Sequence, residues 1–241
     1  MVGIMNNYTY LYFDSIESTN TYLKENYKKL DEFTIAYTYN QTKGRGRMGR
    51  IWNGGSENIA FSILLKPKKE NITILSLLTG LAVSYAIDKY AKTSIKWPND
   101  IIIKDKKVCG ILAEAITSNK IDAYIIGIGI NINQEKFQDD IKDKATSIKL
   151  VVNKDVNQKE VMEAVIKYFD ELYVKYLNDD FSFIEEIRKK NYLLNKVGYI
   201  QNQKCKVIGI NNEGHLIVED ENHQIKNIYS GEFSLQSFYK S

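Results

Sequence analysis

Residues 43–52 read KGRGRMGRIW and combine glycines, arginines and one tryptophan in ten positions. Glycines let a backbone approach a ligand closely, and arginines donate paired hydrogen bonds to phosphate or carboxylate groups. The segment fits G-x-G-x-x-G, but that dinucleotide motif needs a helix directly after it, whereas residues 51–55 are typical of a loop. The pattern therefore predicts an anionic nucleotide held under a flap, with Trp52 covering an adenine. The alternative is a basic loop that is disordered or touches nucleic acid.

Residues 96–100 read KWPND and place a cation, an amide and a carboxylate around a proline turn. Lys96 suits a phosphate, while Asn99 and Asp100 carry the oxygen ligands that Mg²⁺ prefers when it bridges phosphates. The alternative is an ordinary proline turn with a local Asn or Asp hydrogen bond.

Two further segments read as strands with unusual residues. Lys107 opens KVCGIL, where a lysine at the mouth of a strand can reach an anionic reacting centre; the alternative is an edge lysine whose stem covers apolar surface. The segment 127–133 reads GIGININ, and glycines within a strand usually mark the close approach of a ligand or of another backbone. Tight packing of the sheet is the alternative for this segment.

The elements that must position these residues follow from apolar periodicity. Strands are predicted at 8–14, 33–39, 58–65, 108–115 and 123–130, with two short strands flanking Pro98. Helices are predicted from an N-cap at Ser18 to about residue 29, and at 72–91, 158–177 and 181–194. Residues 41–56 are predicted to form a long loop. From residue 197 short strands alternate with turns, at 205–210, 215–219 and 224–229, which predicts a small all-β barrel.

Composition limits the classes of function. The 241 residues carry 33 basic and 30 acidic side chains, and a net charge of +3 is too mild for a nucleic-acid-binding protein. Cys109 and Cys205 lie far apart and predict two buried thiols, and a zinc site is not expected because there are only two histidines, His215 and His223. With no apolar stretch long enough to span a bilayer and no signal peptide at 1–14, we expect a cytoplasmic protein without a membrane partner.

The four segments, in this order and at these separations, resemble the signatures of the biotin protein ligase family. Ser18, Thr19, Asn20 and Gln41 also fall where that family contacts biotin, and the resemblance runs from about residue 10 to the closing GEFSL at 231–235. It implies an α/β fold: a mixed-sheet catalytic domain of the biotin/lipoate ligase type over residues 1–195, and a C-terminal SH3-like β-barrel over residues 196–241.

The resemblance also implies a role for each matching residue. The biotin site would comprise Ser18, Thr19, Asn20, Gln41, Gly44, Arg45, Gly46, Arg47, Lys107, Gly110, Gly127 and Gly129. The ATP and adenylate site would comprise Arg47, Arg50, Trp52, Lys96, Asn99 and Asn131. Arg45, Arg47 and Lys107 would be catalytic, and Asp100 would assist the incoming amine.

The reaction that this family implies has two steps. Biotin and ATP, with Mg²⁺, give biotinyl-5′-AMP and pyrophosphate; a lysine of a biotin carboxyl carrier protein, as in acetyl-CoA carboxylase, then accepts the biotin and releases AMP. The ligands of the metal are not identified by the pattern. Some members of the family form homodimers through edge strands of the sheet.

Two departures from the family pattern affect these expectations. The first predicted strand begins near residue 8, so no N-terminal DNA-binding domain and no repressor role are expected. Ala60 stands where many relatives carry an aromatic residue, which affects one wall of the biotin pocket. The alternatives are a lipoate–protein ligase, which lacks the GRGR loop and the KWPND pattern, and a non-catalytic nucleic-acid-binding module, which the near-neutral charge disfavours.

Overall fold

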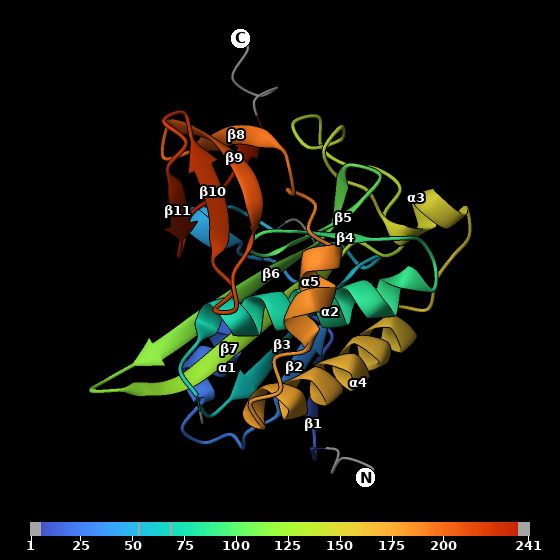
Figure 1. The fold of residues 1–241 in the computed structure, drawn as a ribbon. Helices are drawn as coiled ribbons and strands as arrows, with labels where there is room; N and C mark the ends of the chain where they lie inside the picture. Colours follow the sequence, from blue (N-terminus) through green and yellow to red (C-terminus); the bar gives the residue numbers. More distant parts are fainter. Residues whose placement is uncertain (1–5, 53, 68, 236–241) are drawn as a thin grey trace.

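The computed structural model describes residues 6–52, 54–67 and 69–235. Its centre is a seven-stranded mixed sheet in the order β1-β2-β3-β7-β6-β5-β4 (Figure 1). Among these neighbours β1 and β2 run parallel, and the other pairs are antiparallel. The strands are β1 (Thr9–Phe13), β2 (Thr34–Thr38), β3 (Ile59–Leu65), β4 (Ser94–Lys96), β5 (Asp100–Ile103), β6 (Lys106–Thr117) and β7 (Ile121–Ile130).

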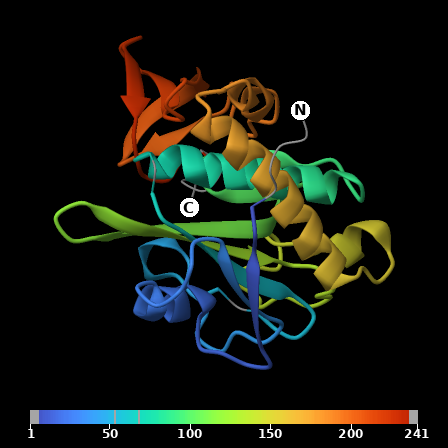
Figure 2. The ribbon, with the colours of Figure 1, turned by 90° about the horizontal axis from the view of Figure 1, so that it is seen from below.

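Helices cover both faces of this sheet (Figures 1 and 2). On one face lie α2 (Ile72–Asp88), α4 (Gln158–Leu177) and α5 (Phe183–Lys189), and on the other lies α1 (Thr19–Asn26). Helix α2 is apolar on nearly every side because it is enclosed between the sheet and the other two helices, whereas α4 buries one stripe and exposes the rest. A short helix, α3 (Ile148–Val152), follows the sheet.

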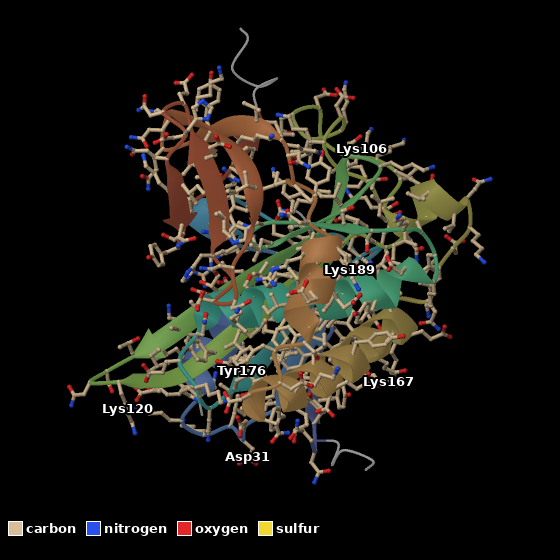
Figure 3. All side chains as sticks on the ribbon, in the orientation of Figure 1. Asp31, Lys106, Lys120, Lys167, Tyr176 and Lys189 are labelled. Carbon is tan, nitrogen blue, oxygen red and sulfur yellow. The ribbon has the colours of Figure 1, made fainter. Side chains whose placement is uncertain are left out.

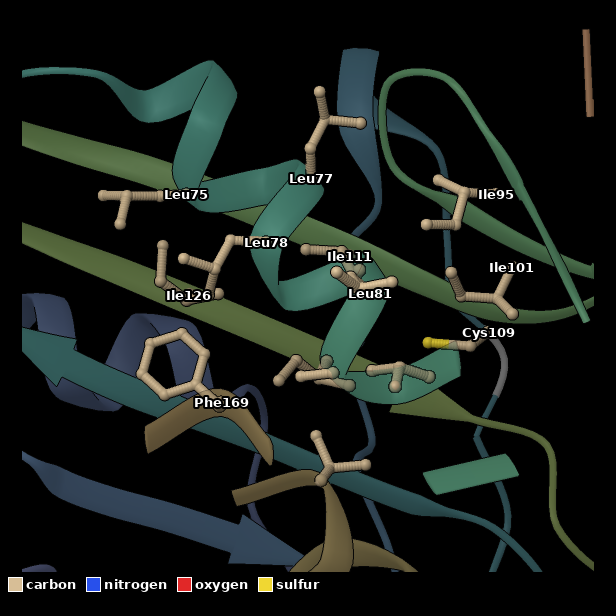
Figure 4. Packing of buried hydrophobic residues seen from close by; sticks show 14 of the residues in the cluster. Leu75, Leu77, Leu78, Leu81, Ile95, Ile101, Cys109, Ile111, Ile126 and Phe169 are labelled. Atoms are coloured by element: carbon tan, nitrogen blue, oxygen red, sulfur yellow. The ribbon is translucent and has the colours of Figure 1, made fainter. Parts of the chain in front are cut away.

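Successive side chains of β7 point to opposite faces of the sheet and belong to two separate clusters of the core. Ile126, Ile128 and Ile130 face α2 and belong to the large cluster shown in part in Figure 4. Ala123 and Ile125 face the opposite way and join a small cluster beneath α1. Because successive residues of a strand point to opposite faces, the glycines that follow at 127 and 129 lie on the α1 side of the sheet.

The C-terminal part forms a second, five-stranded antiparallel sheet, as the sequence predicts. Its order is β11-β10-β9-β8-β12, and several hydrogen bonds join it to the rest of the protein. The buried indole of Trp97 donates to the Gly214 carbonyl at 3.0 Å, and Arg188 Nε donates to the Ile210 carbonyl at 2.7 Å. The strands are β8 (Val197–Ile200), β9 (Gln203–Ile210), β10 (Leu216–Asp220), β11 (Ile225–Ile228) and β12 (Ser234–Leu235).

Some predicted boundaries are wrong. The helix predicted at 181–194 ends at Lys189, because the backbone around Lys190 and Tyr192 instead hydrogen-bonds with Ile95 of β4. The helix predicted to reach residue 91 ends at Asp88. The strands predicted at 108–115 and 123–130 are longer and form a hairpin that extends beyond the sheet, with Lys120 at its end (Figures 1 and 3).

Helix α3 was not predicted, although Ser147 caps it by accepting a hydrogen bond from the Leu150 amide. Five residues are too few to show a helical period in the sequence. Within the described ranges, no helix has both the length and the apolar character needed to span a bilayer.

Candidate active site

A cavity of about 490 Å³ opens on the α1 side of the sheet. This volume falls in the range of roughly 300–1,000 Å³ that is typical of small-molecule sites. Its floor comes from β3, β7 and β6, and its cover is the segment of residues 41–52, called the flap below. The first turn of α1 closes one end, and the turn between β4 and β5 lies at the other.

Small residues from two neighbouring rows of the sheet form part of the floor, aligned by the strand register. Ala60, Gly129 and Gly110 form one row across three strands, and Gly127 lies in the next row. A Cβ atom at Gly127 would lie 2.1 Å from Asn20 Oδ1, and one at Gly129 would lie 2.4 Å from the indole of Trp52. Glycine is therefore required for α1 and the flap to approach the sheet this closely.

The α1 end of the cavity is lined by uncharged hydrogen-bonding groups. Ser18 caps α1 by accepting from the Thr21 amide. Gln41 Oε1 accepts from the Thr19 amide at 2.9 Å, and Thr19 Oγ1 lies 2.7 Å from Ser62 Oγ. Such groups can accept and donate hydrogen bonds to a neutral polar ligand without demanding a counter-charge.

The opposite end is cationic. Lys107 Nζ lies 2.6 Å from Asp100 Oδ1 and 5.6 Å from the centre of the Trp52 ring. Arg47 Nη1 donates to Asn99 Oδ1 at 3.3 Å, and the amide of Asn99 donates to the Ile111 carbonyl at 2.9 Å. Asn131 also lines this part of the cavity. Fixed donors and cations of this kind stabilise a phosphate or carboxylate.

The sequence predicts only a long loop at residues 41–56, whereas in the structure the flap folds into a tight, hydrogen-bonded turn. The Gly46 amide donates to the Arg50 carbonyl at 2.7 Å, and the Trp52 amide donates to the Gly44 carbonyl at 3.0 Å. The turn is completed by a short 3₁₀ segment (Arg47–Gly49) in which Met48 has a φ of 55°. These bonds aim the indole of Trp52 down at the glycine floor.

The arginines of the flap reach three different elements. Arg45 Nη2 donates to Thr21 Oγ1 of α1 at 3.1 Å and lies 3.5 Å from Glu114 Oε2, so the charged group that it places at the α1 end of the cavity is paired with a carboxylate. Arg47 also donates to the Gly231 carbonyl, and Arg50 forms an ion pair with Glu232. The C-terminal segment therefore contributes directly to the cover of the cavity.

Most of the residues predicted for the site come together in this one cavity. Gly44 and Lys96 are predicted residues outside the set that lines it. Gly44 nevertheless sits where a Cβ would lie 2.4 Å from the Trp52 carbonyl oxygen, so it allows the flap to fold. The predicted residues that line the cavity are Ser18, Thr19, Asn20, Gln41, Arg45, Gly46, Arg47, Arg50, Trp52, Asn99, Asp100, Lys107, Gly110, Gly127, Gly129 and Asn131.

One wall of the cavity was not predicted from the sequence. Residues between 137 and 145 line the cavity, and they carry no pattern of spacing that points to a ligand. Glu232 lies in the GEFSL segment that contributed to the resemblance, but no role was predicted for it. The residues of the missed wall are Phe137, Gln138, Asp140, Ile141, Lys144 and Ala145.

Few side chains at the cavity could bind a metal ion. Within the described ranges, no group of three or more His, Cys, Asp or Glu side chains could hold a metal ion on its own. Among the described residues three carboxylates line the cavity, and while Glu232 is paired with Arg50, Asp100 and Asp140 have the oxygen donors that Mg²⁺ prefers. Since Mg²⁺ usually binds one or two carboxylates together with substrate phosphates, these residues fit an ion that arrives with a nucleotide.

Comparison with known proteins matches residues 12–131 to the model of the biotin/lipoate A/B protein ligase family. The bifunctional ligase/repressor BirA of Bacillus subtilis is 34% identical, over 93% of this chain and 73% of that protein. The biotin–[acetyl-CoA-carboxylase] ligase of Paracoccus denitrificans is 36% identical over 38% of this chain and 41% of its own length. The solved structure of the biotin protein ligase of Aquifex aeolicus, in complex with biotin and ATP, superimposes with a TM-score of 0.85 and 36% identity, covering 95% of this chain and 98% of that one.

Proposed function

The chain belongs to the biotin protein ligases of the biotin/lipoate A/B protein ligase family, and we propose that it activates biotin as biotinyl-5′-AMP and transfers it to a lysine of a biotin carboxyl carrier protein. The observation that carries this proposal is the difference in polarity between the two ends of this cavity. An uncharged hydrogen-bonding end and a cationic end share one floor of glycines.

The uncharged end suits the head group of biotin. Its ureido ring presents one carbonyl and two N–H groups, so it needs donors and acceptors rather than charge. Ser18, Thr19 and Gln41 supply hydroxyl and amide groups there. The narrow floor at Gly127 and Gly129 then accommodates the flat ring system and its chain.

The cationic end suits the first chemical step. A carboxylate oxygen of biotin attacks the α-phosphorus of ATP, and the bond from that phosphorus to the bridging oxygen breaks, releasing pyrophosphate. Both reactants are anionic, so Lys107 and Arg47 would lower the barrier by holding them together and by offsetting charge that develops in the transition state. Mg²⁺ held by Asp100 or Asp140 would supply further positive charge to the phosphates.

The second step transfers the biotinyl group. The amine of the carrier lysine attacks the carbonyl carbon of the mixed anhydride, the bond from that carbon to the phosphate oxygen breaks, and AMP leaves. The amine must lose a proton, and Asp100 is the carboxylate we assign to assist it, because it lines the cavity at the cationic end where the anhydride would lie.

The test is pyrophosphate exchange into ATP, measured with biotin, with lipoate and with neither. Exchange that requires biotin supports the proposal, and exchange that lipoate supports equally well contradicts the substrate. Lys107→Ala is expected to reduce the exchange rate by about 100-fold, the usual effect of removing one donor to a developing anion. Lys106→Ala is the matched control, since this neighbouring lysine contacts the Lys142 carbonyl instead of lining the cavity.

A further inference from the structure

Glu114 stands beside the cavity without lining it. It lies on β6 on the same face as Leu112 and Gly110, because alternate residues of a strand share a face. Its side chain is 21% exposed, and its carboxylate is approached by groups from two other parts of the chain. Glu114 therefore acts on the site through residues that do line it.

The first of these contacts fixes the orientation of an amide in the first turn of α1. Asn20 Nδ2 donates to Glu114 Oε2 at 2.9 Å and to the Leu112 carbonyl at 3.2 Å. Both hydrogens of the amide are then used, so Asn20 Oδ1 must face the other way, where Ser62 Oγ donates to it at 2.6 Å.

This orientation decides the direction of the next hydrogen bond. Ser62 has one hydroxyl hydrogen and gives it to Asn20, so in its 2.7 Å contact with Thr19 the Ser62 oxygen accepts. Thr19 also has a single hydroxyl hydrogen, and both Ser62 Oγ and Gln41 Oε1 (3.2 Å) lie where they can accept it, so toward a ligand the Thr19 oxygen accepts. The chain from Thr19 through Ser62 and Asn20 to Glu114 thus presents an acceptor to the cavity.

The second contact ties down the flap. Arg45 Nη2 lies 3.5 Å from Glu114 Oε2, and Lys24 Nζ of α1 lies 3.7 Å from Glu114 Oε1. One carboxylate therefore receives an arginine from the flap, an amide from the pocket wall and a lysine from the same helix. The carboxylate of Glu114 therefore contacts both the flap and the first turn of α1, which forms the pocket wall.

We propose that Glu114 is a positioning residue for the uncharged end of the cavity: it holds the flap closed through Arg45 and keeps Thr19 an acceptor for a ligand N–H group. The ligand rests on the proposed function, which makes it the ureido ring of biotin. The effect on the flap does not depend on that ligand.

Two variants separate the two contacts. Glu114→Gln keeps an oxygen that Asn20 can donate to but removes the charge that attracts Arg45. Glu114→Ala removes both. By calorimetric titration the Kd for biotin is expected to rise about fivefold in Glu114→Gln and about twentyfold in Glu114→Ala, while the KM for ATP stays within twofold. A Kd within twofold of the native value in both variants, or a KM for ATP that rises equally, overturns the proposal.

The matched control is Glu17→Gln. Glu17 pairs with Lys43 at the base of the same flap, 2.6 Å apart, but both side chains are well exposed, so little change in affinity is expected. The second readout is the rate at which trypsin cleaves the flap of the unliganded 241-residue protein. Faster cleavage in Glu114→Gln than in Glu17→Gln is expected, and equal rates overturn the proposal.

Biotin titration and trypsin cleavage together distinguish a failure of the proposed function from a failure of the role assigned to Glu114. If the native protein fails to bind biotin, the proposed function fails, and the trypsin rates still decide whether Glu114 holds the flap. If biotin binds normally and the Glu114 variants behave like the native protein in both measurements, only the role of Glu114 fails.

Discussion

Alanine at Gly127 is expected mainly to lower the stability of the protein, whereas alanine at Gly129 is expected mainly to weaken biotin binding. At Gly127 the new methyl carbon would lie 2.1 Å from Asn20 Oδ1, whereas ordinary contacts begin at about 3.4 Å, so Asn20 must move by about 1 Å. Asn20 is fixed by three hydrogen bonds of 2.6, 2.9 and 3.2 Å. Such a shift sacrifices part of these bonds, each worth roughly 1 kcal/mol, and adds an overpacking cost of about 1–3 kcal/mol.

The expected loss of stability in Gly127→Ala is therefore about 2–4 kcal/mol. For a chain of this size, that loss corresponds to a fall in Tm of roughly 5–15 °C. At Gly129 the methyl carbon meets the indole of Trp52 at 2.4 Å. Trp52 belongs to the flap, which we expect to yield more readily than α1, so Gly129→Ala should lower the stability by less than about 1 kcal/mol while filling the floor of the cavity.

Thermal unfolding of the two variants and calorimetric titration of biotin measure both effects. Gly127→Ala should melt early, and Gly129→Ala should melt close to the native protein but bind biotin about tenfold more weakly, the affinity equivalent of about 1.4 kcal/mol. If Gly129→Ala proves the less stable of the two, the flap is held more firmly than α1, and the reasoning from Asn20 is wrong.

Three further outcomes follow from buried groups. Ser62→Ala leaves Asn20 Oδ1 without its donor in a fully buried place, and urea unfolding should show a loss of about 1–3 kcal/mol. Burial and the nearby Asp170 raise the pKa of the Tyr8 phenol, so the stability it contributes is complete below about pH 10 and is lost as the pH rises further. Tyr8→Phe should flatten the fall in unfolding free energy above about pH 10. Burial also raises the pKa of the Cys109 thiol, whose side chain is inaccessible, so alkylation followed by mass spectrometry should modify it only after denaturant is added.

The sequence predicts those parts of the molecule whose pattern is set by local burial. Strand β7 and helix α4 follow directly from apolar period, since one is buried on both faces and the other on one stripe. The glycines at 127 and 129 were identified because glycine is unfavourable within a strand unless something approaches it closely.

The rest depends on contacts between distant segments. The wall at 137–145 is placed by the fold alone and carries no signature. The position of Arg45 depends on Glu114, 69 positions further along the chain, and the period of β6 gives no hint of that pairing. The register that aligns Ala60 with Gly129 and Gly110 is likewise a property of three strands together.

The cavity floor makes the length of β7 a constraint on ligand binding. Isoleucine and glycine alternate from Ile126 to Ile130, so inserting or deleting one residue before this stretch would turn the isoleucines into the cavity and the glycines into the core. An insertion of two residues would restore the faces but displace the glycines by about 7 Å along the strand. Within the β6–β7 hairpin, a change of chain length is therefore expected to be tolerated at the tip around Lys120, where the parity of β7 from Ile126 to Ile130 can stay unchanged.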